Sequence, residues 1–322
     1  MENERENRNQ PQSSPPRERA SRHIAEAPPG VPRSVDLHLT HQCNYSCRFC
    51  YFTRDGHLAS VPIGQEPSLD LEAFRSLQRI LTSAGVERIT YAGGEPTISP
   101  HLWSLISDWH RLHGGDRQRV MIVTNGTGLS ELRVRLVRDA IAAIKLGGES
   151  NDDTVEAALG RSRGNHVQLL IDRADMLHRL GIEVQLNSVV CSLNKDEDLT
   201  PLVRRVSPRY WKLHQFLPVP GQNDSAIEQL QITEKEFRRF QENHAHLRDL
   251  MVAEDNDLMR GSYAMVDPLG RFFQSTPEGY VRSRHSMLEV GVEAALAEIG
   301  LDWGRYNRRG GDERAFRGRM VA

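Results

Sequence analysis

Hydrophobic positions recur with two different periods between residues 34 and 220, and the two periods alternate along the chain. The segment SVDLHLTH alternates apolar and polar residues, which is the period of a β-strand. The segment LDLEAFRSLQRILTSAG instead places its leucines and phenylalanine at helical spacing and stops at a glycine. About six such alternations predict a parallel sheet with helical crossovers, an α/β fold. Six units are too few for a closed eight-unit barrel, so we expect an open, partial TIM-like (β/α)6 barrel.

The same pattern divides the chain into three parts. Residues 1–33 are rich in Arg, Glu, Asn, Pro and Ser, which predicts a disordered tail. Residues 34–220 form the predicted barrel. Residues 221–322 break the alternation, with one clear helix in TEKEFRRFQENHAHLRDL, a strand pair around the turn at 268–270 and a short helix near VGVEAALAEIG. We expect this last part to be an α+β extension that covers the active site.

Two of the predicted strands carry a polar face. One face of the first strand carries Asp36, His38 and Thr40, and one face of a later strand carries Glu183, Gln185 and Asn187. Alternate strand residues face the lumen of a barrel, and purely structural barrels fill that lumen with Val, Ile and Leu. If the apolar faces pack on the helices, the lumen is polar and requires a polar ligand. The alternative is that these strands lie at a sheet edge and their polar residues meet solvent.

Composition and charge narrow the classes of partner. The chain has 322 residues, is 38% hydrophobic and carries a formal net charge of -2, with a mean hydropathy of -0.54. No global basic field favours nucleic acid or an anionic membrane. No apolar run reaches the roughly 18 residues of a membrane span, and the first residues lack the apolar core of a signal peptide. We therefore expect a cytoplasmic protein that binds neither nucleic acid nor a membrane.

Three of the four cysteines lie together directly after the first predicted strand. Cys43, Cys47 and Cys50 form a C-x3-C-x2-C pattern in HQCNYSCRFCYF. A disulfide framework would spread its cysteines, whereas clustered thiolates in a reducing compartment bind metals or act in redox chemistry. Structural zinc requires four ligands, but Cys191 lies on another strand end and His41 is too near in sequence. Three cysteines on one short loop favour an iron–sulfur cluster with one open iron, and zinc is the alternative.

The spacing of these cysteines and their position after the first strand resemble the radical S-adenosylmethionine (SAM) superfamily. Members bind three irons of a 4Fe–4S cluster through such cysteines and chelate the fourth iron with the amino and carboxyl groups of SAM. The aromatic residue before the third cysteine also fits. A glycine turn, AGGEP, follows the second predicted strand as it does in that family. Glycines there let the backbone approach a ligand closely, and the glutamate takes the SAM amino group.

Longer stretches between residues 34 and 311 resemble the viperins, the SAM-dependent nucleotide dehydratases of antiviral defence. The segments QCNYSC, GGEP, TNGT, LGR, GNHV, LNSV, WK, SY, VGVE and RRGG occur in the order that the family shows. LGRSRGNHV and VGVEAAL are the most specific of them. The second cysteine-rich region of peptide-modifying radical SAM enzymes is missing, which argues against that branch. The sequence shows no pattern of the viperin amphipathic anchor helix, so we expect a chain that resembles the prokaryotic or fungal members.

The resemblance implies a role for each matching residue. It implies that the cluster is bound by Cys43, Cys47 and Cys50. It implies that SAM is contacted by Phe49, Gly93, Gly94, Glu95, Asn125 and Arg161. It implies that the nucleotide is surrounded by Asp36, Arg88, Gln185, Asn187, Tyr210 and Lys212. Tyr263 is the candidate to deliver the final hydrogen or proton, and the alternative is a core tyrosine on a half-buried strand.

The chain departs from the family where viperins that use CTP gather cations around the triphosphate. Arg88 keeps a charge, but Gln185 and Tyr210 do not, Asp36 stands in place of an asparagine and Ala92 in place of a serine. Each lost charge-assisted hydrogen bond is worth about 1.5–3 kcal/mol. Triphosphate binding is therefore expected to be weaker, differently arranged or absent. Replacement charge could come from C-terminal segments that fold over the site, through Arg282, Arg284, Arg305, Arg308 and Arg309. The alternative is that each of these arginines lies on ordinary solvated surface.

The reaction implied by the resemblance is dehydration of a nucleoside triphosphate. A 5′-deoxyadenosyl radical abstracts the C4′ hydrogen, the 3′-hydroxyl leaves as water, and the product is the 3′-deoxy-3′,4′-didehydro nucleotide. A one-electron reductase, a ferredoxin or a flavodoxin would supply electrons. One alternative is a radical SAM enzyme acting on a nucleoside mono- or diphosphate or on a sugar. Another is a non-catalytic scaffold of the same fold, although a scaffold needs neither the cysteine triad nor GGEP.

Overall fold

The computed structural model describes residues 30–53, 58, 60–62, 64–115, 119–161 and 164–310. The first strand begins at Ser34, but the described structure begins at residue 30, and Val31, which the sequence assigned to the tail, is buried in the main core. The predicted disordered tail lies outside the described residues up to residue 29, so its conformation stays a prediction.

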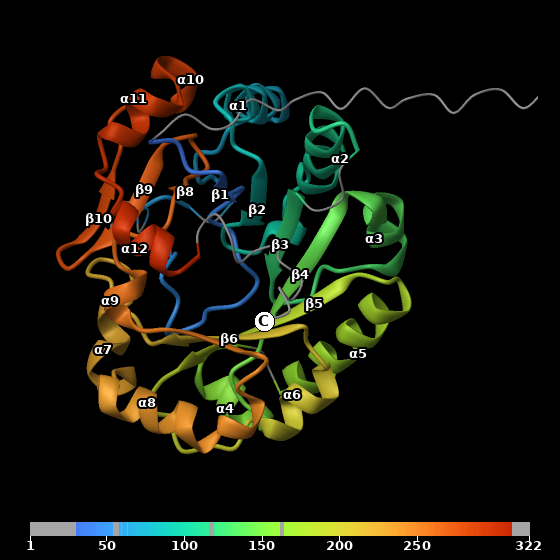
Figure 1. Ribbon diagram of the computed structural model, residues 1–322, viewed down its shortest axis with the longest axis vertical. Helices are drawn as coiled ribbons and strands as arrows, with labels where there is room; N and C mark the ends of the chain where they lie inside the picture. The colour runs from blue at the N-terminus through green and yellow to red at the C-terminus, as the bar shows by residue number, and fades with distance from the viewer. Residues whose placement is uncertain are drawn as a thin grey trace, which may run out of the picture.

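Six parallel strands form in chain order and confirm the predicted open, partial barrel. They are β1 (Ser34–His38), β2 (Arg88–Ala92), β3 (Val120–Thr124), β4 (Ile141–Gly147), β5 (Glu183–Val190) and β6 (Tyr210–Gln215). Each strand pairs in parallel with the next one. Figure 1 shows this sheet curving around a central space, with the helices on its outer side.

Helices follow the strands and cover the outer face of the sheet. They are α1 (Leu71–Ser83), α2 (Leu102–Leu112), α3 (Glu131–Val137), α4 (Asp153–Ala158), α5 (His166–Arg179) and α6 (Thr200–Val206). Helix α1 begins after Asp70, whose carboxylate accepts a hydrogen bond from the Ala73 N–H at 2.8 Å, as an N-cap residue does. Its buried residues, Phe74, Leu77 and Leu81, face the core.

The strand register explains why the lumen is polar. One row of paired residues crosses five strands and is fully buried, namely Leu37, Tyr91, Ile122, Ile144 and Val184. This row belongs to the main hydrophobic core together with the helix residues. Successive strand residues point to opposite faces. The neighbours of this row, among them Asp36 and Lys145, therefore face the inside of the barrel.

The C-terminal part extends the same sheet at both edges. Strand β7 (Met251–Glu254) pairs in parallel with β6, and β8 (Met265–Val266) pairs in parallel with β1. Strands β9 (Phe272–Thr276) and β10 (Gly279–Arg282) follow in antiparallel order. The strand pair predicted around the turn at 268–270 is thereby confirmed as β8 and β9. The full order is β10-β9-β8-β1-β2-β3-β4-β5-β6-β7.

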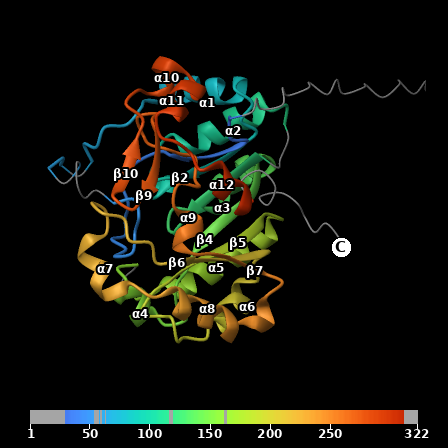
Figure 2. The same cartoon turned by 60° about the vertical axis from the view of Figure 1, so that its left-hand side comes forward.

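The remaining helices connect and flank these strands. They are α7 (Asp224–Leu230), α8 (Glu234–Asn243), α9 (Asn256–Met259), α10 (Met287–Val290), α11 (Val292–Ala297) and α12 (Trp303–Arg308), with short 3-10 helices η2 (Pro96–Ile98), η4 (Arg138–Ala140) and η5 (Ala245–Leu247). The single long helix predicted after Thr233 is wrong in its length, because α8 ends at Asn243 and η5 follows. Figures 1 and 2 both show α10 and α11 beside α1.

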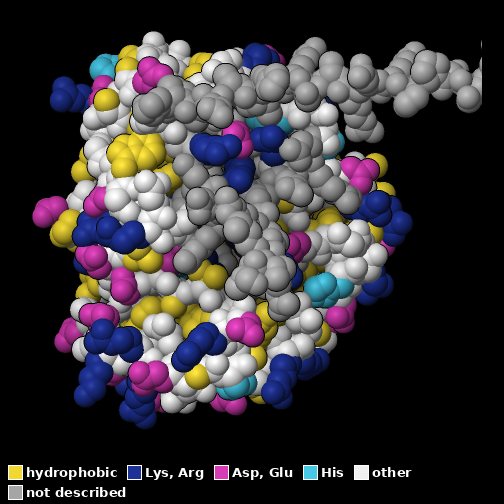
Figure 3. Space-filling model, in the orientation of Figure 1, with side chains coloured by type: hydrophobic (Ala, Val, Ile, Leu, Met, Phe, Trp, Pro, Cys, Tyr) yellow, Lys and Arg dark blue, Asp and Glu magenta, His cyan; other side chains and the backbone are white. Residues whose placement is uncertain are grey.

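The surface carries both signs of charge. Figure 3 shows Lys and Arg side chains interspersed with Asp and Glu over one face, in keeping with the formal net charge of -2. None of the helices in the described ranges is long and apolar enough to cross a membrane.

Candidate active site

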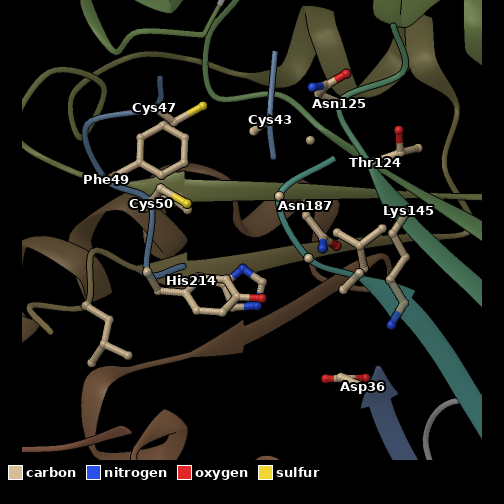
Figure 4. A pocket seen from close by; sticks show the side chains of 18 of the residues that line it. Asp36, Cys43, Cys47, Phe49, Cys50, Thr124, Asn125, Lys145, Asn187 and His214 are labelled. Atoms are coloured by element: carbon tan, nitrogen blue, oxygen red, sulfur yellow. The ribbon is translucent and has the colours of Figure 1, made fainter. Parts of the chain in front are cut away.

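The inside of the barrel holds a cavity of about 260 Å³ that the predicted site residues line. Every strand from β1 to β6 contributes residues to its wall, and the turns after β1, β2 and β3 close one end of it. Ligand sites in parallel α/β folds lie at the carboxyl ends of the strands, where these turns are. Figure 4 shows the cysteines and Phe49 at one end of the cavity, with Asp36 and Lys145 at the other.

Three thiols enter the cavity from one loop. Cys43, Cys47 and Cys50 all line it, and they lie on the segment after β1, residues 39–53, which we call the cysteine loop. The loop is anchored to the end of α4, where the Ser46 N–H donates to the Gly160 carbonyl at 3.2 Å. Burial raises the pKa of Cys43, so this thiol keeps its proton until a metal replaces it.

The fourth cysteine lies outside the cavity. Cys191 is fully buried and packs with Phe49 and Phe216 in a small apolar cluster. Burial raises its pKa to about 11, as expected of an inert thiol in apolar surroundings. The donor set that faces the cavity therefore consists of the three thiols of the cysteine loop, which fits a cluster with one iron left open.

The glycine turn after β2 packs on the cysteine loop. The Gly94 N–H donates to the Thr40 carbonyl at 2.7 Å, and the Glu95 N–H donates to the Gln42 carbonyl at 2.8 Å. A Cβ atom at Gly94 would lie 2.0 Å from the Gln42 carbonyl oxygen, and one at Gly93 would lie 2.6 Å from that of Thr40. The close approach that requires glycine is therefore to the cysteine loop. The sequence had suggested an approach to the ligand.

Glu95 joins the ends of β2 and β3. Its buried Oε1 accepts hydrogen bonds from the Thr97 N–H at 3.0 Å and from the Thr124 hydroxyl at 2.6 Å. Its Oε2 accepts from the Asn125 N–H at 2.8 Å, which leaves acceptor capacity on that oxygen. Asn125 is itself held, because its side-chain amide donates to Asn44 at 2.9 Å. An ammonium group in the cavity would find an acceptor here.

Arg161 and two buried glutamates lie beside the cysteine loop. The Arg161 guanidinium forms an ion pair with Glu149, donates from Nη1 to the Gly147 carbonyl at 3.4 Å and lies 5.3 Å from the Phe49 ring centroid. Burial opposes its charge, yet Glu149 raises the pKa of Arg161, so it stays cationic. Burial also raises the pKa of Glu156, whose carboxylate accepts from the Glu149 N–H at 2.7 Å. The cation predicted to face SAM is thus already oriented by an acidic partner.

A second polar group lies toward the C-terminal strands. The Lys212 ammonium forms an ion pair with Glu254 at 2.8 Å and donates to the Tyr263 hydroxyl at 2.9 Å. The Tyr263 hydroxyl in turn donates to Glu254. The Arg309 guanidinium lies 3.7 Å from the centroid of the Tyr263 ring. Three elements, β6, β7 and the end of α12, therefore meet at one tyrosine.

The charges in this group hold one another in place. Burial disfavours the Glu254 carboxylate, but the positive charges around it, with Lys212 the largest contributor and Arg309 another, together outweigh that effect and lower the pKa of Glu254 to about 2. Burial and the neighbouring Glu254 raise the pKa of Tyr263 to about 12. Burial lowers the pKa of His214 to about 3, so this imidazole is neutral. At neutral pH the cavity thus presents a protonated tyrosine and a cationic lysine.

Lys145 is a cavity residue that the sequence did not reveal. It enters from β4, and its ammonium forms no hydrogen bond or ion pair with any other described residue. Burial lowers the pKa of Lys145 to about 8, although Asp36 opposes the shift. The signal available in the sequence was a single charged residue inside the apolar strand AAIKLGG. The sequence did not identify Glu254 as a site residue because β7 was not predicted. It did not identify His214 and Glu149 because they belong to no recognisable motif.

Most of the predicted site residues come together, and three do not. The cavity is lined by Asp36, Cys43, Cys47, Phe49, Cys50, Gly93, Gly94, Glu95, Asn125, Arg161, Asn187, Lys212 and Tyr263. Arg88, at the start of β2, is outside the lining. The Gln185 amide is buried and donates to Glu183 at 3.0 Å. The Tyr210 ring lies 5.5 Å from the Arg209 guanidinium, and it too is outside the lining.

Comparison with known proteins places this geometry in a family. A model of the radical SAM superfamily matches residues 37–206. An S-adenosylmethionine-dependent nucleotide dehydratase from Lacinutrix mariniflava is 34% identical over 283 residues, which cover 86% of this chain and 58% of that protein. A protein of the same name from Flammeovirga pacifica is 34% identical over 286 residues, which cover 86% of this chain and 94% of that protein.

Solved structures agree at the level of the fold. Streptococcus suis SuiB bound to the precursor peptide SuiA has a TM-score of 0.62 at 14% identity, covering 87% of this chain and 67% of that chain. Native anSMEcpe with bound AdoMet has a TM-score of 0.56 at 12% identity, covering 85% of this chain and 82% of that chain. Identities this low show the fold alone.

The fold, the cysteine loop and the family match define the chain as a radical SAM enzyme. Such enzymes use a 4Fe–4S cluster and SAM, and the thiols, the spare oxygen of Glu95 and the cation of Arg161 fit that pair of cofactors. Within the superfamily, the chain belongs to the S-adenosylmethionine-dependent nucleotide dehydratases, the viperin-like family.

Proposed function

We propose that this enzyme dehydrates a nucleoside triphosphate to its 3′-deoxy-3′,4′-didehydro analogue. The observation that carries the proposal is a continuous cavity that joins the cysteine loop to a polar end bearing Lys145, Asn187 and Lys212 on three adjacent strands. One end suits cofactors and the other suits a polar, anionic ligand. The names of the relatives from Lacinutrix mariniflava and Flammeovirga pacifica give the reaction class.

At the cofactor end of the cavity, different residues would bind the cluster and SAM. The three thiols of the cysteine loop would hold the cluster, Glu95 would accept from the amino group of SAM, and Arg161 would face its carboxylate. When bound, the cluster and SAM supply a radical that removes a hydrogen atom from the substrate. The protein's own contribution is to hold both ligands in one cavity so that the reacting atoms stay close.

At the substrate end, Tyr263 is the group that can deliver hydrogen or a proton. Its hydroxyl donates to Glu254 and accepts from Lys212, so the O–H direction is fixed. Because its pKa is raised to about 12, it keeps its proton over the physiological range. Asn187 lies next to Lys212 in the sheet register and offers an amide to ribose or base oxygens.

The product would lack a 3′-hydroxyl and would terminate polymerase chains, which is the basis for proposing a role in antiviral defence. Electrons would come from a one-electron reductase, a ferredoxin or a flavodoxin. A reducing cytoplasm would suit the thiolate ligands of the cluster. These parts of the proposal rest on the resemblance to viperins and on the chemistry of the product.

The test is anaerobic SAM cleavage by the reduced holoenzyme across nucleoside tri-, di- and monophosphates. A nucleoside triphosphate should raise 5′-deoxyadenosine formation well above the substrate-free rate. With substrate deuterated at C4′, deuterium should appear in 5′-deoxyadenosine. Retention of the label in the substrate would refute hydrogen abstraction at C4′.

A second candidate is the same chemistry on a nucleotide with fewer phosphates. It is favoured by one observation, that Glu254 neutralises Lys212 while Gln185 and Tyr210 carry no charge. Stimulation by mono- or diphosphates alone in the same assay would select this candidate.

A further inference from the structure

The cations of the cavity differ in whether they have a partner. Among the described residues, three cationic side chains line it, namely Lys145, Arg161 and Lys212. Arg161 is paired with Glu149, and Lys212 is paired with Glu254 and Tyr263. Lys145 forms neither a hydrogen bond nor an ion pair within the part of the chain that the structure describes. A partly buried ammonium without a partner is costly unless a ligand supplies one.

The charged groups around Lys145 determine the net charge at this end of the cavity. The charged groups that act on it are Asp36 on β1, Lys212 on β6, Glu254 on β7 and Arg309 after α12. The two anions and the two cations of this set balance. Lys145 therefore supplies the net positive charge at this end of the cavity, where it lies far from the cysteines (Figure 4).

The strand register relates Lys145 to the two substituted positions. Lys145 on β4 is the register partner of Gln185 on β5, and Gln185 is the partner of Tyr210 on β6. The three residues form one row across adjacent strands. Positions 185 and 210 are those at which the viperin resemblance leads one to expect cations. The row therefore still contains one cation, Lys145, but it lies on the neighbouring strand β4, and its side chain lines the cavity.

We propose that Lys145 binds the phosphate oxygens of the nucleotide and takes the place of the cations missing at Gln185 and Tyr210. The inference rests on the proposed function and names the residue that makes the site specific for a phosphorylated ligand. A lysine acts on phosphate as a point charge with three donors and needs no fixed fork geometry. Asp36 also lines the cavity, and its carboxylate favours the charged form of the Lys145 ammonium.

The experiment measures equilibrium binding to the reconstituted holoenzyme with SAM bound and without reductant. The probes are CTP, UTP, GTP and ATP, each compared with its nucleoside. Lys145→Gln should weaken triphosphate binding by about 10- to 100-fold, as expected for a lost charge-assisted hydrogen bond, and leave nucleoside binding unchanged. Lys145→Arg keeps the charge and should stay within a few fold of the wild type.

A matched control is Lys195→Gln. Lys195 lies outside the cavity and forms an ion pair with Glu236 at 2.7 Å, so its replacement should leave triphosphate affinity unchanged. Iron content and SAM affinity, measured on every variant, show whether the cofactor end is intact. If Lys145→Gln does not fold, the pH profile of Lys145→Arg decides. Wild-type affinity should fall as pH rises through about 8, while that of Lys145→Arg should stay flat.

The outcomes separate the two proposals. The inference is wrong if the wild type binds triphosphates and Lys145→Gln binds them equally well. It is also wrong if Lys145→Gln weakens nucleoside binding as much as triphosphate binding, because Lys145 then does not bind the phosphates. The same conclusion follows if wild type and Lys145→Arg share one pH profile. If no nucleotide binds the wild type, the proposed function fails first, and the inference fails with it.

Discussion

Replacing Gly94 with alanine should disturb the cysteine loop more than the SAM site. The added Cβ would lie 2.0 Å from the Gln42 carbonyl oxygen, which must retreat by about 1 Å or more to reach van der Waals distance. That shift breaks the backbone hydrogen bonds from Gly94 to Thr40 and from Glu95 to Gln42. Each is worth about 0.5–1.5 kcal/mol, so their loss destabilises the protein by about 1–3 kcal/mol. Gln42 immediately precedes Cys43, so the displacement reaches the first thiol.

The assay is iron and sulfide content after anaerobic reconstitution, followed by thermal unfolding. Gly94→Ala should incorporate less than about half of the wild-type iron and unfold about 2–10 °C lower. Gly304→Ala is the matched control. Gly304 also lacks a positive φ, and its added Cβ would meet the ends of two movable side chains, the Asp302 carboxylate at 3.3 Å and the Arg308 guanidinium at 3.6 Å. This control should keep wild-type iron content and stability.

The result that would refute the reasoning is a Gly94→Ala protein with full iron content and a wild-type unfolding temperature. The turn would then tolerate a side chain, and the glycine would be needed only for approach to SAM. Measuring SAM affinity on the same protein distinguishes the two cases. Loss of SAM binding at full iron content would restore the interpretation that the sequence first suggested.

Three further predictions concern other parts of the site. Replacing any one cysteine of the cysteine loop by Ala should abolish the cluster, while Cys191→Ala should keep about four irons per chain. Loss of iron from Cys191→Ala would contradict the three-thiol donor set. Tyr263→Phe removes the hydroxyl between Lys212 and Glu254, so the ratio of dehydrated product to 5′-deoxyadenosine should fall about tenfold, and an unchanged ratio would exclude Tyr263 as a donor. Glu254 has a pKa lowered to about 2, so its stabilising effect, on the order of 3 kcal/mol, is present above about pH 4.5 and lost as pH falls toward 2. Acid unfolding of Glu254→Gln should lack that pH dependence, and identical acid profiles would show that the ion pair adds no stability.

The local sequence was enough to predict the barrel and the cofactor end. Strand and helix periods are set by neighbouring residues, so the order of β1 to β6 could be predicted directly. The cysteine loop and the GGEP turn are short, continuous motifs, and each functional atom in them lies within a few residues of the others. Cys43, Cys47, Cys50 and Glu95 accordingly line the cavity as their spacing indicated.

The substrate end depends on contacts between distant segments, and the tertiary structure alone decided it. Lys145 became a site residue because β4 lies between β3 and β5 in one register, and Glu254 because β7 pairs with β6 at the sheet edge. A single lysine in an apolar strand and a glutamate in an unpredicted strand carry no local pattern. Whether a charged side chain is paired, and by what, depends on strands brought together by folding. The sequence by itself therefore determined which cofactors the protein holds, and the packing of the sheet determined which charges are left to meet the substrate.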